Sequence, residues 1–463
     1  MYQIEIQTIK RRIDMMNTKN TKEHGKEKGL SVWQLTMIAL GTVIGGSFFI
    51  GSAVAIKAAG PAIIISYILA GAIVYFILFA LSEMTVSRPC EGSFRTYAAE
   101  AFGPGAGFVV GWVYWTGMVL AMSSEATAVS LLFRQWFPKI SIALLGSGII
   151  IVVTFLNLLG ADKLSKLESG LAIIKVLAIL AFIIFAILLI LGLIKGSSAI
   201  GVGELKNEEL APNGIKGVAG SMLIVLFAYA GFEVIGLAAS EANNPKETIP
   251  KAIHSTVFIL IAFYVISILV LLPLIPTSGL DEEESPMVAA LNRAGMDWAG
   301  NAINIVLITA ILSTMLAAMF GLGRMMRSLA DAKQAPKFLK DKTDVPYRGI
   351  LFSGFAMLIG LGFGLLLPKV YLFLISSGGF SVLFTYTMIV ATHIRFRSKY
   401  GCPKGKCKVS WFPYSSLIVL ICLIAALFSM PLISGQGYGF IAGIVMLVIY
   451  TFIYSLVKIS RKK

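Results

Sequence analysis

Long apolar stretches alternate with short polar connections along almost the whole chain after its first 31 residues. Twelve such stretches can be recognised, and most hold the roughly 20 residues that a helix needs to cross a bilayer. They cover residues 33–55, 62–84, 106–132, 141–160, 170–194, 216–240, 252–276, 300–323, 349–367, 370–394, 413–433 and 438–458. The pattern predicts an all-α polytopic membrane protein with twelve transmembrane helices.

Polar tails at residues 1–31 and 460–463 flank a predicted membrane domain at 32–459. The first tail has no apolar core, which is typical of a solvated tail rather than a signal peptide. An even number of spans puts both termini on one side. Of the 39 Lys and Arg residues, eight fall in the opposite loops and Lys175 lies within a span, which leaves 30 on the side of the termini. The positive-inside rule therefore predicts cytoplasmic termini in a cell-membrane protein.

Composition supports this class, because 57% of the residues are hydrophobic and only 14% are charged. A soluble domain has about a quarter of its residues charged. Topology and contact with anionic lipid account for most of the net charge of +15, so no nucleic-acid partner is expected. Three histidines, none near a plausible nucleophile at membrane depth, argue against an enzyme. Cys402 and Cys407 have no nearby His and make a poor zinc site, so we expect no metal and no cofactor.

Glycines interrupt the first span near mid-membrane, where four of the residues from Gly41 to Ser52 are glycine. Glycine costs a helix about 1 kcal/mol relative to alanine. Two interpretations stay open on this pattern: a small-residue face for helix packing, or a broken helix that binds a solute.

A second interruption lies in the sixth span, where Gly231 and Glu233 fall near mid-membrane. Two breaks five spans apart suggest two five-helix halves, at about 33–194 and 216–394, with the second inserted upside down. Paired broken helices in inverted repeats are a transporter architecture, with the solute bound where the breaks meet. We therefore predict a 5+5 inverted repeat (LeuT-like) with broken helices 1 and 6, followed by two extra helices at about 413–458.

Such breaks suit a zwitterionic solute, which must lose water at both its charged ends. The amides of Gly45, Gly46 and Ser47 can meet a carboxylate at the N-terminal end of a half-helix. The ammonium group needs carbonyl oxygens at the ends of the preceding half-helices. We expect the binding residues at the two breaks to be Val43, Ile44, Gly45, Gly46, Ser47, Phe227, Ala228, Ala230 and Gly231.

Ionisable residues within the spans are costly and are therefore functional candidates. Glu233 either orients the unwound backbone, the preferred interpretation, or titrates. Glu125 either carries a proton or hydrogen-bonds as a neutral acid to a neighbouring helix. Lys175 either snorkels to the inner surface or has a function.

Several motifs, in this order, resemble those of bacterial amino-acid permeases of the amino acid–polyamine–organocation superfamily, in its amino-acid transporter branch. The resemblance covers nearly everything after residue 31 and rests on residues 91–97, Gly111-Trp112-Val113-Tyr114-Trp115, Phe232-Glu233, residues 240–245, Ile249-Pro250-Lys251-Ala252-Ile253, Gly323-Arg324-Met325, Gln334-Ala335-Pro336-Lys337 and His393-Ile394-Arg395-Phe396-Arg397. One departure is that Gly45-Gly46-Ser47 stands where the family usually has Gly-Thr-Gly.

The resemblance implies further roles. Phe227 would close over the substrate as an aromatic gate. Lys175 would take the place of the sodium ion of sodium-coupled relatives of the fold, and burial would allow its ammonium to exchange protons. Lys175 is therefore the expected proton-coupling residue, with Glu125 as a second candidate.

Together these features predict a permease that imports a neutral L-amino acid, threonine or serine being typical, by proton symport and alternating access. The expected partners are the amino acid and the lipid bilayer. The alternatives are an amino-acid exchanger, a permease for cationic amino acids and, more remotely, an amino-acid-sensing membrane receptor.

Overall fold

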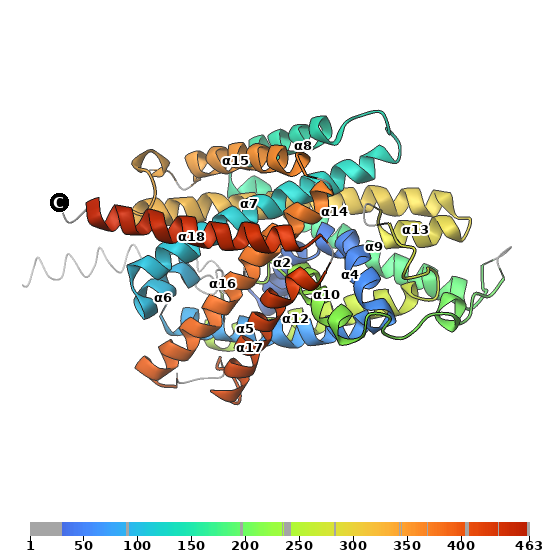
Figure 1. Cartoon of the computed structure of the whole chain (residues 1–463), viewed down its shortest axis with the longest axis horizontal. Helices are drawn as coiled ribbons and strands as arrows, with labels where there is room; N and C mark the ends of the chain where they lie inside the picture. Colours follow the sequence, from blue (N-terminus) through green and yellow to red (C-terminus); the bar gives the residue numbers. More distant parts are fainter. Residues whose placement is uncertain are drawn as a thin grey trace, which may run out of the picture.

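The computed structural model describes residues 30–460 except 89–91, 195–197, 234, 236–241, 282–283, 342, 344, 368, 403–406 and 434, and it describes no side chains at 161–169 and 460. Within this part of the chain the structure is helical, apart from turns and one isolated bridge between Leu30 and Ala242 (Figure 1). The α-helices are α2 (Val32–Val43), α3 (Gly46–Phe49), α4 (Gly51–Ala59), α5 (Ile63–Ser87), α6 (Ser93–Phe102), α7 (Pro104–Arg134), α8 (Ile142–Asn157), α9 (Ala161–Ile190), α10 (Gly214–Ala228), α12 (Pro245–Leu271), α13 (Pro286–Arg293), α14 (Asp297–Asp331), α15 (Tyr347–Leu365), α16 (Val370–Tyr400), α17 (Tyr414–Ser429) and α18 (Gly437–Ser460).

Nine helical stretches of the described chain are long and apolar enough to cross a membrane, with α4 and α5 counted as one stretch. The apolar helices α2, α8 and α10 are shorter. Each predicted span except the sixth coincides with one helix or with a set of helix fragments, the first with α2, α3 and α4 together. The sixth, 216–240, coincides with α10 as far as Ala228, and its positions 234 and 236–240 lie outside the described residues. A polytopic helical membrane protein is thus confirmed, while twelve spans and an inverted repeat stay predictions.

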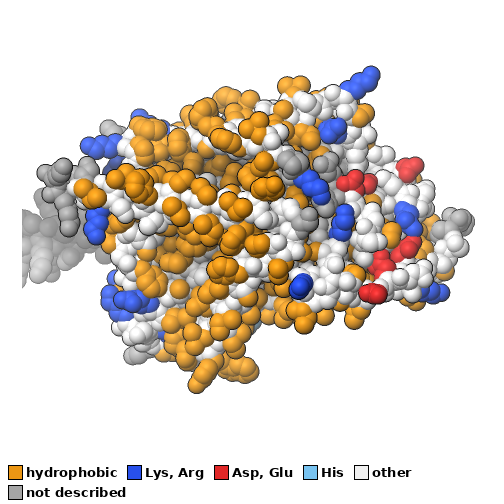
Figure 2. Space-filling model, viewed as in Figure 1, with side chains coloured by type: hydrophobic (Ala, Val, Ile, Leu, Met, Phe, Trp, Pro, Cys, Tyr) orange, Lys and Arg blue, Asp and Glu red, His pale blue; other side chains and the backbone are white. Residues whose placement is uncertain are grey.

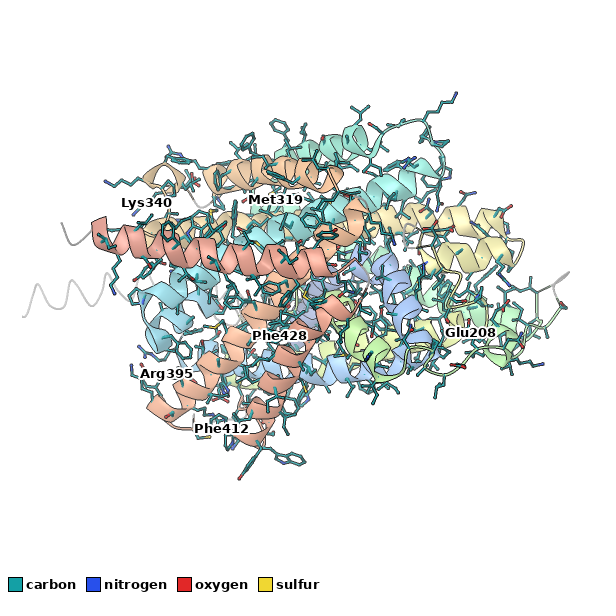
Figure 3. All side chains as sticks on the ribbon, in the orientation of Figure 1. Glu208, Met319, Lys340, Arg395, Phe412 and Phe428 are labelled. Carbon is teal, nitrogen blue, oxygen red and sulfur yellow. The ribbon has the colours of Figure 1, made fainter. Side chains whose placement is uncertain are left out.

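The molecular surface has an apolar middle between two charged ends. In Figure 2, hydrophobic side chains cover the middle, Lys and Arg occupy the end where α18 finishes, and Asp and Glu appear at the opposite end among further basic residues. Lys340 and Arg395 lie at the first end and Glu208 at the second (Figure 3). Large side chains on α18, such as Val448 and Phe452, are more than half exposed. Exposed apolar surface of this extent fits contact with lipid.

Local sequence features explain where two important helices begin. The hydroxyl of Ser31 accepts a hydrogen bond from the Gln34 amide, and the Gln34 side chain accepts one from the Ser31 amide. This reciprocal pair fixes the start of α2. α7 begins at Pro104, directly after Gly103, because proline fits the first turn of a helix without a lost hydrogen bond.

Helices α7 and α16 pack so closely that no side chain fits between them at one point. A Cβ atom added to Gly117 would lie 2.0 Å from the Cβ atom of Ser381. Small residues allow this approach of two membrane helices. This close contact holds α7, which carries Glu125, against α16, which carries Tyr386.

Candidate functional site

The first apolar segment is interrupted at Ile44 and Gly45. α2 ends at Val43, both following residues have extended backbone, and α3 begins at Gly46. A Cβ atom on Gly45 would lie 3.1 Å from Thr314 Oγ1, so α14 approaches the break closely. The interruption leaves the last carbonyls of α2 and the first amides of α3 without helical partners.

Lys175 on α9 is fully buried at this break, with none of its surface exposed. Its Nζ donates hydrogen bonds to the Gly41 carbonyl at 2.5 Å and to Thr314 Oγ1 at 2.9 Å. The Thr314 hydroxyl donates in turn to the Ile44 carbonyl at 3.0 Å. A cation at the carbonyl end of a helix is stabilising. The snorkelling interpretation of Lys175 is therefore wrong, because its ammonium points into the protein.

Glu125 on α7 binds the opposite side of the break. Its Oε2 accepts a hydrogen bond from the Gly46 amide at 2.8 Å, and the carboxylate also accepts one from the Ser47 amide. It interacts electrostatically with Lys175. The Gly46 and Ser47 amides, predicted to meet a substrate carboxylate, thus already hold a carboxylate of the same chain. This contact is not evident from the sequence.

The second break directly contacts the first. α10 ends at Ala228, and Gly231 has φ +105°, a conformation that favours glycine. A Cβ atom on Gly231 would lie 2.7 Å from the Thr42 carbonyl oxygen, and the Thr42 hydroxyl donates to the Gly231 carbonyl at 3.1 Å. The two interruptions therefore meet at the centre of the helix bundle.

Glu233 follows the second break and is buried. Its Oε2 accepts hydrogen bonds from the Gly231 amide at 3.0 Å and from the Tyr386 hydroxyl at 3.2 Å, and its Oε1 accepts one from the Tyr114 hydroxyl at 3.1 Å. Hydrogen bonds from several donors hold a buried carboxylate in one orientation. In this arrangement Glu233 ties unwound backbone to α7 and α16.

A cavity of about 80 Å³ lies where the two breaks meet. Its lining includes several of the residues predicted from sequence, namely Val43, Ser47, Phe227, Ala230, Gly231, Glu125 and Glu233. Ile44, Gly45 and Gly46 lie at the first break and Lys175 contacts it, but none of the four lines the cavity. Ala228 does not line it either, and its carbonyl accepts a hydrogen bond from the Tyr264 hydroxyl at 2.9 Å. Ligand pockets typically measure roughly 300–1,000 Å³. This conformation therefore has room only for a very small ligand.

Hydroxyl groups form part of the site that sequence reasoning missed. Thr42, Thr314, Tyr114 and Tyr386 all hold a break in place, and Tyr371 donates to the Gly46 carbonyl at 3.3 Å. Tyr114 stands in the motif at Gly111–Trp115, but the chain has 15 tyrosines and nothing in the sequence context of Tyr371 and Tyr386 distinguishes them. Among the described residues, no group of three or more His, Cys, Asp and Glu side chains could hold a metal ion.

Comparison with known proteins gives matches over nearly the full length. The model of the amino acid permease family matches residues 34–463. The chain is 34% identical over 440 residues to the gamma-aminobutyric acid permease of Bacillus subtilis (strain 168), covering 92% of this chain and 94% of the relative. It is 32% identical over 425 residues to the aromatic amino acid transport protein AroP of Salmonella typhimurium (strain SL1344), covering 90% and 93%.

Proposed function

The chain belongs to the amino acid permease family, and we propose that it imports a neutral L-α-amino acid together with a proton by alternating access. The observation that carries the proposal is the contact between two interrupted helices with a buried ammonium group at one of them. Interrupted helices meeting at mid-bundle suit a solute-binding site in a transporter.

The substrate binds, in this proposal, where the breaks meet. Its carboxylate takes the Gly46 and Ser47 amides after Glu125 has released them. Its ammonium binds carbonyl oxygens at the ends of α2 and α10, at Val43, Ile44, Phe227 and Ala230. Phe227 closes over the bound molecule. The arrangement is supported by the position of Val43, Ser47 and Phe227 around one cavity.

A neutral side chain fits the lining of this cavity best. Small or apolar residues dominate it, including Ala230, Gly231, Ala317, Ala318 and Gly321. Its carboxylates, Glu125 and Glu233, each hold hydrogen bonds to a break. A cationic side chain would need a desolvated carboxylate of its own. The Bacillus relative's name makes γ-aminobutyrate a second candidate substrate.

Proton coupling is assigned to Lys175. Loss of its proton would remove the positive charge that faces the carbonyl end of α2 and would weaken the hydrogen bonds to Gly41 and Thr314. α2 would then be held less firmly against α9 and α14, which lets the half-helix move. In an exchanger, the alternative mechanism, Lys175 stays charged throughout the cycle.

Both termini are placed in the cytoplasm of a cell-membrane protein. The excess of Lys and Arg on the side of the termini supports this orientation under the positive-inside rule.

Uptake by purified protein in liposomes tests the proposal. Labelled threonine should accumulate when an inward proton gradient is imposed and should only equilibrate without one. Excess serine or alanine should compete, whereas lysine should not. Inhibition by lysine alone would contradict a neutral substrate, and inhibition by γ-aminobutyrate alone would contradict an α-amino acid. Accumulation that needs a preloaded amino acid instead of a proton gradient would identify an exchanger.

A further inference from the structure

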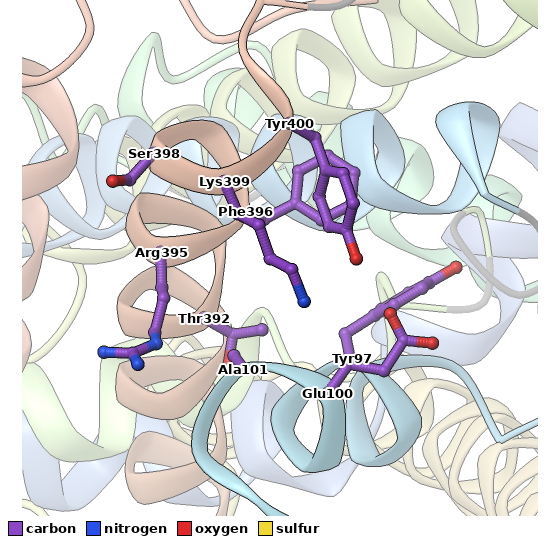
Figure 4. Close-up of a pocket in the computed structure, with 9 residues that line it drawn as sticks. All are labelled: Tyr97, Glu100, Ala101, Thr392, Arg395, Phe396, Ser398, Lys399 and Tyr400. Atoms are coloured by element: carbon purple, nitrogen blue, oxygen red, sulfur yellow. The ribbon is translucent and has the colours of Figure 1, made fainter.

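A hollow of about 410 Å³, which we call the α6–α16 pocket, lies outside the site described above. It is bounded by α6 and by the last turns of α16, at the end of the molecule where Lys340 and Arg395 lie (Figures 3 and 4). None of its lining residues takes part in either helix break. The pocket is therefore separate from the proposed substrate site.

Positive charge dominates the α6–α16 pocket. Figure 4 shows the Lys399 ammonium pointing into its centre, with Arg395 on one side and Glu100 on the other. Glu100 forms an ion pair with Arg88 at 3.4 Å. Over the residues that the structure describes, Arg395 and Lys399 contact aromatic rings but no carboxylate: the Arg395 guanidinium lies 5.5 Å from the Phe102 ring centroid. Two basic side chains are therefore available to an anion.

A buried hydroxyl group lines the same pocket. Thr392 is 1% exposed, and its Oγ1 has no hydrogen-bond partner among the described residues. A buried polar atom without a partner costs roughly 1–3 kcal/mol. An anion between Arg395 and Lys399 would supply the missing acceptor.

An apolar groove adjoins this pocket along α16. Phe384 and Met388 line a second hollow of about 290 Å³ together with Val109 of α7 and Tyr454 of α18. Met388 precedes Thr392 by four residues, so the two lie on one face of α16, about 6 Å apart along its axis. The basic pocket and the apolar groove therefore form one strip along α16, and the exposed helix α18 borders it at the groove.

We propose that this strip binds one anionic phospholipid. The head-group phosphate lies between Arg395 and Lys399 and accepts a hydrogen bond from Thr392, while an acyl chain fills the groove along Phe384 and Met388. Basic pockets between membrane helices suit acidic head groups, and Arg and Lys form strong charge-assisted hydrogen bonds to phosphate. A free phosphate compound offers the same head-group chemistry, but it would leave the apolar groove empty.

Thermal unfolding of the full-length protein in detergent tests the proposal. Dioleoyl phosphatidylglycerol should raise the unfolding temperature in a saturable way, whereas dioleoyl phosphatidylcholine and glycerol 3-phosphate should not. The double variant Arg395→Gln/Lys399→Gln should bind phosphatidylglycerol about 30-fold more weakly, since each basic residue near an anionic head group accounts for roughly a fivefold change in affinity. Ala106→Trp should weaken binding through the groove, because Ala106 lines it.

A matched control removes equal charge from the same end of the molecule. Lys337→Gln/Lys408→Gln changes two exposed lysines outside the pocket and should keep the response of the parent. Equal stabilisation by glycerol 3-phosphate would overturn the lipid assignment in favour of a soluble anion. An unchanged response of the Arg395/Lys399 variant, or an equal loss in the control, would overturn the site itself.

Discussion

The Lys175 ammonium on α9 lies 2.5 Å from the Gly41 carbonyl oxygen on α2, three residues before the first helix break. The same ammonium reaches Thr314 on α14 at 2.9 Å. One buried side chain thus joins the half-helix before the break to two long helices. Any change in its charge therefore changes the hydrogen bonds that hold α2 against α9 and α14.

Lys175→Ala should abolish accumulation driven by a proton gradient, because the buried ammonium group at the carbonyl end of α2 would be lost. Counterflow exchange of labelled threonine should persist if the binding residues remain in place. The measurement is uptake into liposomes with and without an inward proton gradient. Lys139→Ala, at an exposed loop lysine, serves as the control. A Lys175→Ala protein that concentrates substrate as the parent does would exclude the coupling role.

Gly46→Val should abolish substrate binding. A Cβ atom at Gly46 would lie 2.5 Å from Glu125 Oε2, so any side chain displaces this carboxylate and blocks approach to the amides. Gly148→Val is the matched control, because no atom lies within 4 Å of a Cβ atom there. Both variants should express and insert, and threonine binding by calorimetry should separate them. Normal threonine binding by Gly46→Val would indicate instead that the glycines of the first span serve only helix packing.

Gly231→Ala should destabilise the protein by roughly 1–2 kcal/mol through its left-handed backbone alone, and further through the close Thr42 carbonyl. Unfolding temperature in detergent measures the effect. Gly362→Ala on α15 is the control, since it has free space around its Cβ position and should be neutral or slightly stabilising. Equal unfolding temperatures for the two variants would contradict the strained turn at the second break.

Cys407 should resist thiol reagents near neutral pH while Cys402 reacts. Burial, together with the nearby Glu83 carboxylate, raises the pKa of the Cys407 thiol from 9.0 to about 12, and Cys402 is exposed. Because the folded-state pKa is the higher one, the folded protein favours the protonated thiol. This contribution to stability is complete below about pH 9 and is lost as the pH rises from 9 toward 12. Mass spectrometry after brief maleimide treatment at pH 7.5 shows which cysteine is labelled first. Faster labelling of Cys407 than of Cys402 would refute the prediction.

The breaks and Lys175 could be located from sequence because glycines and charges are costly inside a membrane span. The carboxylate on the Gly46 amide could not be predicted, because Glu125 lies 79 residues away and its own segment does not reveal which face of α7 turns inward. Helix ends were also missed: α14 runs over Asp297–Asp331 and α16 continues to Tyr400, beyond the apolar stretches at 300–323 and 370–394. An apolar stretch indicates the part of a helix that contacts lipid. The helix itself can extend further into water, as long as its backbone hydrogen bonds continue.

The Glu125 carboxylate at the Gly46 and Ser47 amides has a consequence for affinity. If a substrate carboxylate uses these amides, binding is an exchange of one carboxyl group for another, and the resting transporter carries an internal competitor. The measured dissociation constant then reports the difference in binding between the two carboxyl groups, so a tightly held Glu125 makes the apparent affinity weaker than the site's intrinsic affinity. The same competition speeds substrate release, because the Glu125 side chain can form hydrogen bonds to the amides as soon as the ligand leaves them.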